Sequence, residues 1–207
     1  MGTPFLEWAV AARPLRGEAV SGDQHLVAGF PGGVLVAVID GLGHGPSAEA
    51  AARAAIEVLK EEPARPVADL MARCDTALGR LRGVVMSLAS FEVTTASMSW
   101  IGVGNVEAEL IRCLTGQAVL RERLLLWGGI VGQSPGRLRP ATLKMVRGDV
   151  IVFTTDGIAA DFLSETFLAK VRSGESTEEL ANHVLERHAQ ERDDALVLVA
   201  RYRGALE

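Results

Sequence analysis

Short apolar runs rich in β-branched residues are the clearest pattern along this chain. Val34–Asp40 (VLVAVID), Val150–Thr154 (VIVFT) and Ala195–Ala200 (ALVLVA) are apolar almost throughout. Runs of this kind are typical of strands that are buried on both faces. Further strands are predicted at Phe5–Ala12, Gln24–Ala28, Thr94–Ile101, Val106–Leu114, Ala118–Leu126 and Ala141–Met145.

Three other segments have the apolar spacing and composition of helices. Ser47–Lys60 is rich in Ala and Glu, which are good helix formers. Val67–Leu81 repeats its apolar residues at spacings of three and four, which places them on one helix face. Thr177–Gln190 shows the same amphipathic pattern. Proline residues between the first two segments predict two separate helices rather than one.

The order of these elements predicts the fold class. Hairpin turns are expected at Pro31-Gly32-Gly33, Gly104-Asn105, Thr115-Gly116 and Arg147-Gly148-Asp149. Strands therefore come first, then two helices, a run of antiparallel strands, one or more helices and a last strand. This order differs from the strand–helix alternation of a parallel sheet. It indicates an α+β sandwich, formed as a single domain over residues 1–207.

Composition narrows the classes of function. The formal net charge of −5 gives no support for a nucleic-acid-binding surface, although a local phosphate site remains compatible with it. The apolar runs are too short for a membrane span, so no membrane partner is expected. The two cysteines, Cys74 and Cys113, have no metal-ligand spacing, and the residues before the first strand are not expected to be a signal peptide. We therefore expect a reducing cytoplasm.

Carboxylates stand at the ends of several predicted strands. Asp40-Gly41 and Asp156-Gly157 each follow an apolar strand, Asp193-Asp194 comes directly before another, and Asp23 precedes the strand at Gln24–Ala28. If these strands are neighbours, the carboxylates converge at one end of the sheets. Clusters of Asp without His or Cys suit Mg²⁺ or Mn²⁺, and two such ions can activate water for phosphate ester hydrolysis.

Each Asp-Gly pair also has an ordinary structural interpretation, because Asp and Gly are common turn residues. Asp193-Asp194 could likewise end a helix and keep a turn in solvent. The joint pattern favours a site, since each Asp adjoins a core strand rather than an arbitrary loop.

Taken together, these residues resemble the metal-dependent protein phosphatases of the type 2C (PPM) superfamily. The resemblance rests on Ser21-Gly22-Asp23, Asp40–Gly45 (DGLGHG), Gly148-Asp149 with Thr154–Gly157 (TTDG), and Asp193-Asp194-Ala195. It is greatest to the bacterial branch typified by the sporulation phosphatase SpoIIE and the stand-alone stress-response phosphatase RsbX. It implies an αββα sandwich with two Mn²⁺ or Mg²⁺ ions at one end.

The resemblance also implies a role for each residue. Asp40 would bridge both metals and position the attacking water, and the Gly41 carbonyl would bind one metal. Asp156 and Asp193 would bind the other, and Asp23 would hold metal-bound water. Asp194 would be supportive.

Other positions depart from the pattern of the larger relatives. The residue after the first Asp-Gly is Leu42, where those relatives have a histidine that is their proposed acid, so His44 could serve as the acid or only shape the loop. Arg13 and Arg16 are the candidates for binding phosphate, although no motif fixes either of them.

The implied activity is hydrolysis of phosphoserine or phosphothreonine in proteins. The expected partners are phosphorylated scaffold or antagonist proteins of a bacterial stress-signalling complex of the stressosome type. Two alternatives stay open at this point. One is a catalytically silent binding module with the phosphatase fold, and the other is a hydrolase of small phosphate esters.

Overall fold

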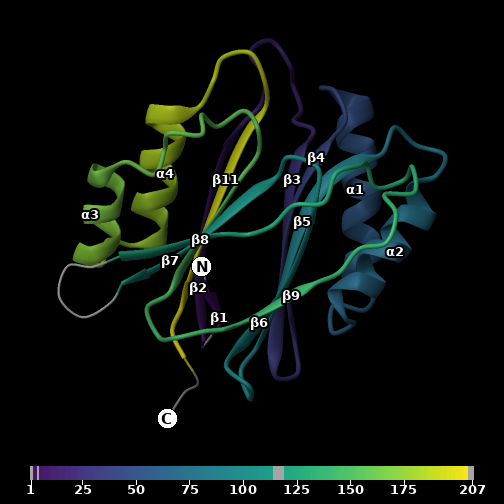
Figure 1. Ribbon diagram of the computed structural model, residues 1–207. Coiled ribbons are helices and arrows are strands. Elements are labelled where there is room, and N and C mark those ends of the chain that lie inside the picture. The colour runs from purple at the N-terminus through teal and green to yellow at the C-terminus, as the bar shows by residue number, and fades with distance from the viewer. Residues whose placement is uncertain (1, 4, 114–118, 205–207) are drawn as a thin grey trace.

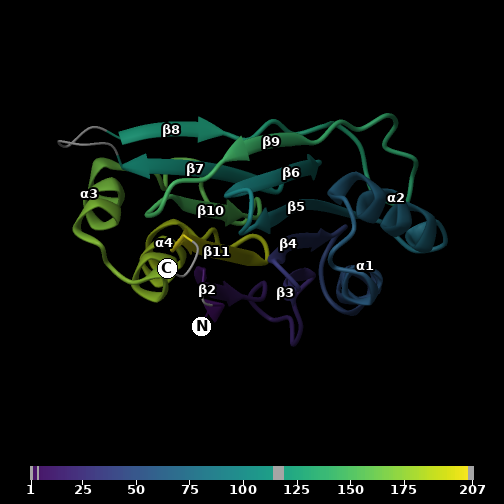
Figure 2. The same cartoon turned by 90° about the horizontal axis from the view of Figure 1, so that it is seen from below.

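The structure is a computed structural model, and it describes residues 2–3, 5–113 and 119–204. Two antiparallel sheets lie face to face, and a pair of helices covers the outer face of each (Figures 1 and 2). The expected α+β sandwich is confirmed, with its helix–sheet–sheet–helix layers.

Each sheet combines segments from distant parts of the chain. The six-stranded sheet has the order β1 (Gly2–Thr3), β2 (Leu6–Arg13), β11 (Ala195–Tyr202), β10 (Val150–Thr154), β7 (Glu107–Cys113) and β8 (Val119–Arg123). The five-stranded sheet has the order β3 (Asp23–Phe30), β4 (Gly33–Gly41), β5 (Val84–Glu92), β6 (Ser97–Val103) and β9 (Ala141–Lys144). Helices α1 (Pro46–Glu61) and α2 (Val67–Leu78) cover the five-stranded sheet, and α3 (Glu165–Ser173) and α4 (Thr177–His188) cover the other.

Burial on both faces explains the continuous apolar run of β4. Val34, Val36 and Val38 point into the core between the sheets, while alternate residues such as Leu35 and Ile39 pack against the helices. All five side chains have no exposed surface. The strand therefore needs apolar residues at every position, not at every second one.

Capping residues fix the ends of the helices on the six-stranded sheet. Ser176 forms a capping box with Glu179 at the N-cap, and α4 begins at Thr177, as expected. Ser164 caps α3, which ends at Gly174 in the left-handed conformation. The sequence had not located α3.

Two of the expected hairpins are wrong. Gly104-Asn105 joins β6 of one sheet to β7 of the other, and residues 147–149 likewise connect β9 and β10 across the two sheets. These turns therefore close the sandwich instead of extending a sheet. The hairpin of β3 and β4 is confirmed. The pairing of β7 with β8 is also observed, but the turn at Thr115-Gly116 lies outside the described residues.

The central strand β5 had no counterpart in the prediction. Its polar residues include Ser87, which is fully buried because its hydroxyl donates a hydrogen bond to the Val106 carbonyl at 2.6 Å. The segment at Thr94–Ile101 is a strand only from Ser97, since residues 93–96 form the turn before β6.

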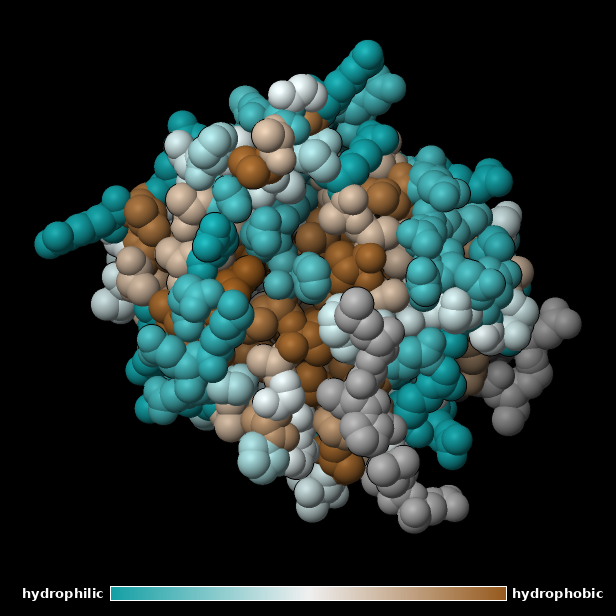
Figure 3. Space-filling view, turned by 180° about the vertical axis from the view of Figure 1, so that it is seen from behind, coloured by the Kyte–Doolittle hydropathy of each residue, from teal (hydrophilic) through white to brown (hydrophobic). Residues whose placement is uncertain are grey.

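The inter-sheet core reaches the surface along the open edge of the sandwich. Seen from behind, apolar side chains form a strip between hydrophilic margins (Figure 3). Half-buried Trp8 and Val10 of β2 and Val27 of β3 pack against this core. Within the described ranges, no helix has the length and apolar character needed to cross a membrane.

Candidate metal centre

The strand ends that carry aspartate meet at one end of the sandwich. In the five-stranded sheet, Asp23 begins β3 and lies directly opposite Asp40, near the end of β4. In the six-stranded sheet, Asp156 follows β10 and Asp193 precedes the neighbouring β11. The four carboxylates thus come from two strand ends in each sheet, as the sequence pattern predicts.

Two glycines let the backbone approach closely enough to form this site. A Cβ atom at Gly41 would lie 2.1 Å from the carbonyl oxygen of Ala48 in α1. A Cβ at Gly157 would lie 1.8 Å from the carbonyl oxygen of Asp194. Both distances are impossible for real atoms, so each Asp-Gly pair has a packing reason for its glycine.

Three of the predicted ligands line one open cavity of about 310 Å³. Asp40, Asp156 and Asp193 share its wall with His44 and Arg192. Asp23 lies beside the cavity and is only 5% exposed. The structure therefore brings together, around one space, side chains that are up to about 170 positions apart in the chain.

Burial and mutual repulsion raise the pKa values of three carboxylates at this site. Burial, and then the charges of Asp23, Asp156 and Asp193, raise the pKa of Asp40 to about 8. Burial also raises the pKa of Asp23 to about 7, although its hydrogen bond from Thr155 acts in the opposite direction. Partial burial and the charge of Asp193 raise the pKa of Asp156. The site concentrates negative charge that a cation would relieve.

Two hydrogen-bonding side chains hold the carboxylates in place. The Thr155 hydroxyl donates to Asp23 at 2.7 Å and accepts from the Leu196 backbone at 2.9 Å, which links the two sheets. The Asn105 amide donates to Asp156 at 2.7 Å. Neither Thr155 nor Asn105 was predicted as a site residue, since a turn signal was the only feature of Asn105 in the sequence.

Asp194, expected to be supportive, accepts hydrogen bonds from the backbone of another loop. Its carboxylate accepts hydrogen bonds from the backbone of Leu15 at 2.7 Å and of Gly22 at 2.8 Å. It therefore fastens the loop between β2 and β3 beside the loop that precedes β11, at the upper end of the sandwich in Figure 1.

The donor set fits a hard divalent cation. Its side chains are carboxylates, whose oxygen atoms suit Mg²⁺ and Mn²⁺, and Gly41, whose carbonyl is the other predicted ligand, directly follows Asp40 at the end of β4. Within the described part of the chain, no three His, Cys, Asp or Glu side chains already stand close enough to share an ion. The carboxylates would have to draw together around a cation, and its charge would offset their repulsion.

Further polar residues lie at the rim. The Nδ1 atom of His44 is 2.7 Å from the Glu18 carboxylate. Arg13 and Arg16 line a smaller adjoining hollow of about 170 Å³, whose wall also includes Asp193. Glu18 and Arg192 were not predicted, because nothing in their local sequence separates them from ordinary surface charges.

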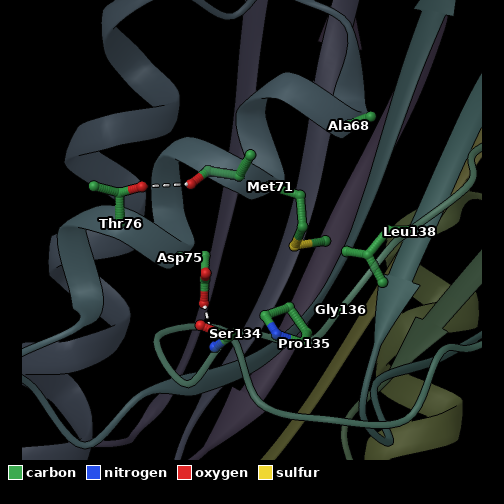
Figure 4. A pocket seen from close by; sticks show the side chains of 9 residues that line it. Ala68, Met71, Asp75, Thr76, Ser134, Pro135, Gly136 and Leu138 are labelled. Carbon is green, nitrogen blue, oxygen red and sulfur yellow. Dashed lines mark hydrogen bonds between the residues drawn. The ribbon is translucent and has the colours of Figure 1, made fainter.

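A second cavity, of about 440 Å³, lies between α2 and residues 134–138 (Figure 4). Its one acidic lining residue, Asp75, accepts hydrogen bonds from the backbone of Gly132 at 2.6 Å and of Ser134 at 3.1 Å. This charge is used to hold a loop, and none of the predicted ligands lines the cavity.

Facing antiparallel sheets that share acidic side chains at one end define the PPM, or type 2C, class of phosphatase, and the fold of this chain matches structures of that class. More specifically, the chain belongs to the family described as Stage II sporulation protein E (SpoIIE), whose pattern matches residues 31–203. The resemblance inferred from the motifs is confirmed.

Individual relatives agree with this assignment. The phosphoserine phosphatase RsbX of Bacillus subtilis (strain 168) is 22% identical over 178 residues, which cover 86% of this chain and 85% of RsbX. A structure of RsbX in complex with magnesium has a TM-score of 0.84 at 20% identity and covers 98% of each chain.

Two further structures extend the comparison. A structure described as "The bacterial stressosome: a modular system that has been adapted to control secondary messenger signaling" has a TM-score of 0.83 at 29% identity, covering 95% of this chain and 99% of the other. The catalytic domain of the serine/threonine phosphatase PstP in complex with two manganese ions has a TM-score of 0.69 at 19% identity, covering 96% and 99%.

Proposed function

We propose that the protein is a metal-dependent phosphatase that hydrolyses phosphoserine or phosphothreonine in proteins. The observation that carries this proposal is the single cavity lined by Asp40, Asp156 and Asp193, with Asp23 buried beside it. The similarity to RsbX and to PstP, two phosphatases whose structures were solved with magnesium or manganese, supports the proposal.

Five residues would hold two Mn²⁺ or Mg²⁺ ions. Asp40 would bridge them, the Gly41 carbonyl would bind one, and Asp156 and Asp193 would bind the other. Asp23 would act through a bound water. When present, the ions would supply Lewis-acid polarisation of the phosphoryl group and an activated water. The hydrogen bonds from Thr155 and Asn105 hold the carboxylates in a fixed orientation for this task.

In this proposal, His44 would give a proton to the leaving serine oxygen. Its Nδ1 atom lies against the Glu18 carboxylate, so an Nδ1–H donor pointing to Glu18 leaves the Nε2 atom free to work at the cavity. Glu18 would thereby fix the orientation of the ring, as carboxylates commonly do for functional histidines. A proton donor matters most for an alkoxide leaving group, which is a strong base.

The substrates we propose are phosphorylated scaffold or antagonist proteins of a bacterial stress-signalling complex, in the cytoplasm. The support comes from RsbX, from the structure described with the bacterial stressosome, and from the match between their folds and this one. Arg13 and Arg16 remain candidates for binding phosphate from the adjoining hollow.

Hydrolysis assays with an aryl phosphate and a phosphoserine protein would test the proposal. Activity should require Mn²⁺ or Mg²⁺ and fall by orders of magnitude in Asp40→Asn and Asp156→Asn. The Asp69→Asn variant, which changes an exposed charge on α2, is the matched control. Full activity in excess EDTA, or in Asp40→Asn, would refute the two-metal site.

The same assays separate the alternatives. Metal binding without any turnover would indicate a silent binding module. Turnover of small esters but of no phosphoprotein from the host would indicate a small-molecule phosphohydrolase.

A further inference from the structure

Arg192 stands on a part of the backbone that is held on both sides. On one side, the Gln190 amide N–H donates to the Gly157 carbonyl at 2.7 Å. On the other, the Asp194 carboxylate is fixed by the backbone of Leu15 and Gly22. The base of the Arg192 side chain therefore keeps its place on the wall of the cavity.

The guanidinium of Arg192 is exposed and available to a ligand. Among the described residues it has no carboxylate within the 4.0 Å of an ion pair, although Asp156 and Asp193 line the same cavity. It is also the one Lys or Arg side chain, in the described part of the chain, that lines this cavity. The cavity thus combines a set of carboxylates with one arginine, whose positive charge acts on Asp156 without forming a close ion pair.

Arg13 and Arg16 occupy a different position. They line the adjoining hollow, and the Arg13 guanidinium donates to the Ala189 carbonyl at 3.3 Å. Neither belongs to the wall that carries Asp40 and Asp156. A phosphoryl group bound in the cavity at those carboxylates would therefore have Arg192 on the wall around it, with Arg13 and Arg16 in the adjoining hollow.

We propose that Arg192 binds the non-bridging oxygens of the phosphoryl group in the cavity and orients it for hydrolysis. This inference rests on the proposed function, since the phosphoryl group would be that of the phosphoprotein. A guanidinium suits the task because its planar fork can donate two parallel hydrogen bonds to phosphate oxygens.

The size of the effect follows from the kind of contact. Hydrogen bonds to charged groups contribute enough that their loss weakens binding by about 10- to 100-fold. Arg192→Ala should weaken phosphate binding by this factor, and Arg192→Lys, which keeps the charge but not the fork, should give an intermediate value. Removing a positive charge should leave Mg²⁺ affinity unchanged or increase it.

The test is calorimetric titration of the Mg²⁺-loaded protein with inorganic phosphate, alongside Mg²⁺ titration of the same variants. The matched control is Arg187→Ala, which removes an exposed arginine of α4 that does not line the cavity. An Arg13→Ala/Arg16→Ala double variant tests whether the adjoining hollow binds the phosphate instead. The KM for a phosphoserine peptide gives a second measure of phosphate binding.

Weaker phosphate binding in Arg192→Ala, partial recovery in Arg192→Lys and undiminished Mg²⁺ affinity would support the inference. Wild-type phosphate affinity in Arg192→Ala would overturn it, as would a loss that follows weakened Mg²⁺ binding. Loss of phosphate binding in the double variant alone would also overturn it. If phosphate binds through Arg192 but no phosphoserine substrate is hydrolysed, the proposed function fails and only the phosphate-binding role of Arg192 stands.

Discussion

Replacing Asp40 with Asn should stabilise the metal-free protein at neutral and alkaline pH. The pKa of Asp40 rises from an ordinary value of 3.8 to about 8 on folding, because the side chain is buried and faces other carboxylates. Between these two values the folded state holds a proton that the unfolded state releases. The free energy of unfolding therefore falls as pH rises through this window, and Asn, which stays neutral, removes the penalty.

The size of this stabilisation follows from the pKa shift of Asp40 and from the openness of the cavity to solvent. One pKa unit corresponds to about 1.4 kcal/mol. The cavity is open, so salt and water screen much of the repulsion, and we expect a net gain of about 2 kcal/mol at pH 8. For a domain of this size, such a gain raises the melting temperature by about 4–8 °C.

Thermal unfolding in EDTA at several pH values between 5 and 8 measures this effect. The difference in melting temperature between Asp40→Asn and wild type should grow with pH, whereas Asp69→Asn should show no such trend. Adding Mn²⁺ should stabilise the wild type more than the variant, because only the wild type offers the bridging carboxylate. An Asp40→Asn protein that is no more stable than wild type at pH 8 would refute this account of the electrostatics.

Three further variants test other parts of the site. Gly157→Ala should lower the free energy of unfolding by about 3 kcal/mol and weaken Mn²⁺ binding, because there is no space for its Cβ atom. Gly128→Ala is the control, since a Cβ atom there has no neighbour within 4 Å, and it should change neither quantity. Denaturant and metal titrations measure the two effects. His44→Gln should reduce kcat more for a phosphoserine peptide than for an aryl phosphate, because the aryl leaving group needs less help from an acid. An equal loss of kcat on both substrates would contradict the role of His44 as the acid. Thr155→Val should lower the free energy of unfolding in urea by about 1–3 kcal/mol. It should also raise the pKa of Asp23 further, since the hydroxyl that stabilises the Asp23 charge is lost. An unchanged urea midpoint would show that this hydrogen bond between the sheets is dispensable.

The sequence predicts the strongest elements of this fold because their composition matches their surroundings. β4, β10 and β11 are apolar almost throughout since both faces of each strand are covered, and their ends were located within one or two residues. The strand β5 was missed because polar residues such as Ser87 interrupt its pattern. The buried Ser87 hydroxyl donates to the Val106 carbonyl on another strand segment, a pairing that the sequence around Ser87 does not reveal.

Strand pairing was less predictable than strand position. A glycine turn such as Gly104-Asn105 looks the same whether the chain returns to the same sheet or crosses to the opposite one. The choice depends on which faces must be buried, and that is a property of the whole sandwich.

Some residues of the candidate site were likewise predictable from the sequence, and others were not. Its acidic residues were visible because each Asp adjoins a core strand. The residues that orient or complement them, Thr155, Asn105, Glu18 and Arg192, are ordinary polar residues in the sequence. Their place becomes evident only when the two sheets are assembled.

The division of the carboxylates between the two sheets has a consequence for folding kinetics. Asp23 and Asp40 belong to one sheet, and Asp156 and Asp193 stand at strand ends of the other, so the four come together only once the sheets have docked. A cation that needs both pairs would bind after the transition state for docking. Such an ion slows unfolding while leaving the folding rate nearly unchanged. The bound metal would then increase the kinetic stability of the assembled sandwich, and its loss would shorten the lifetime of the native state.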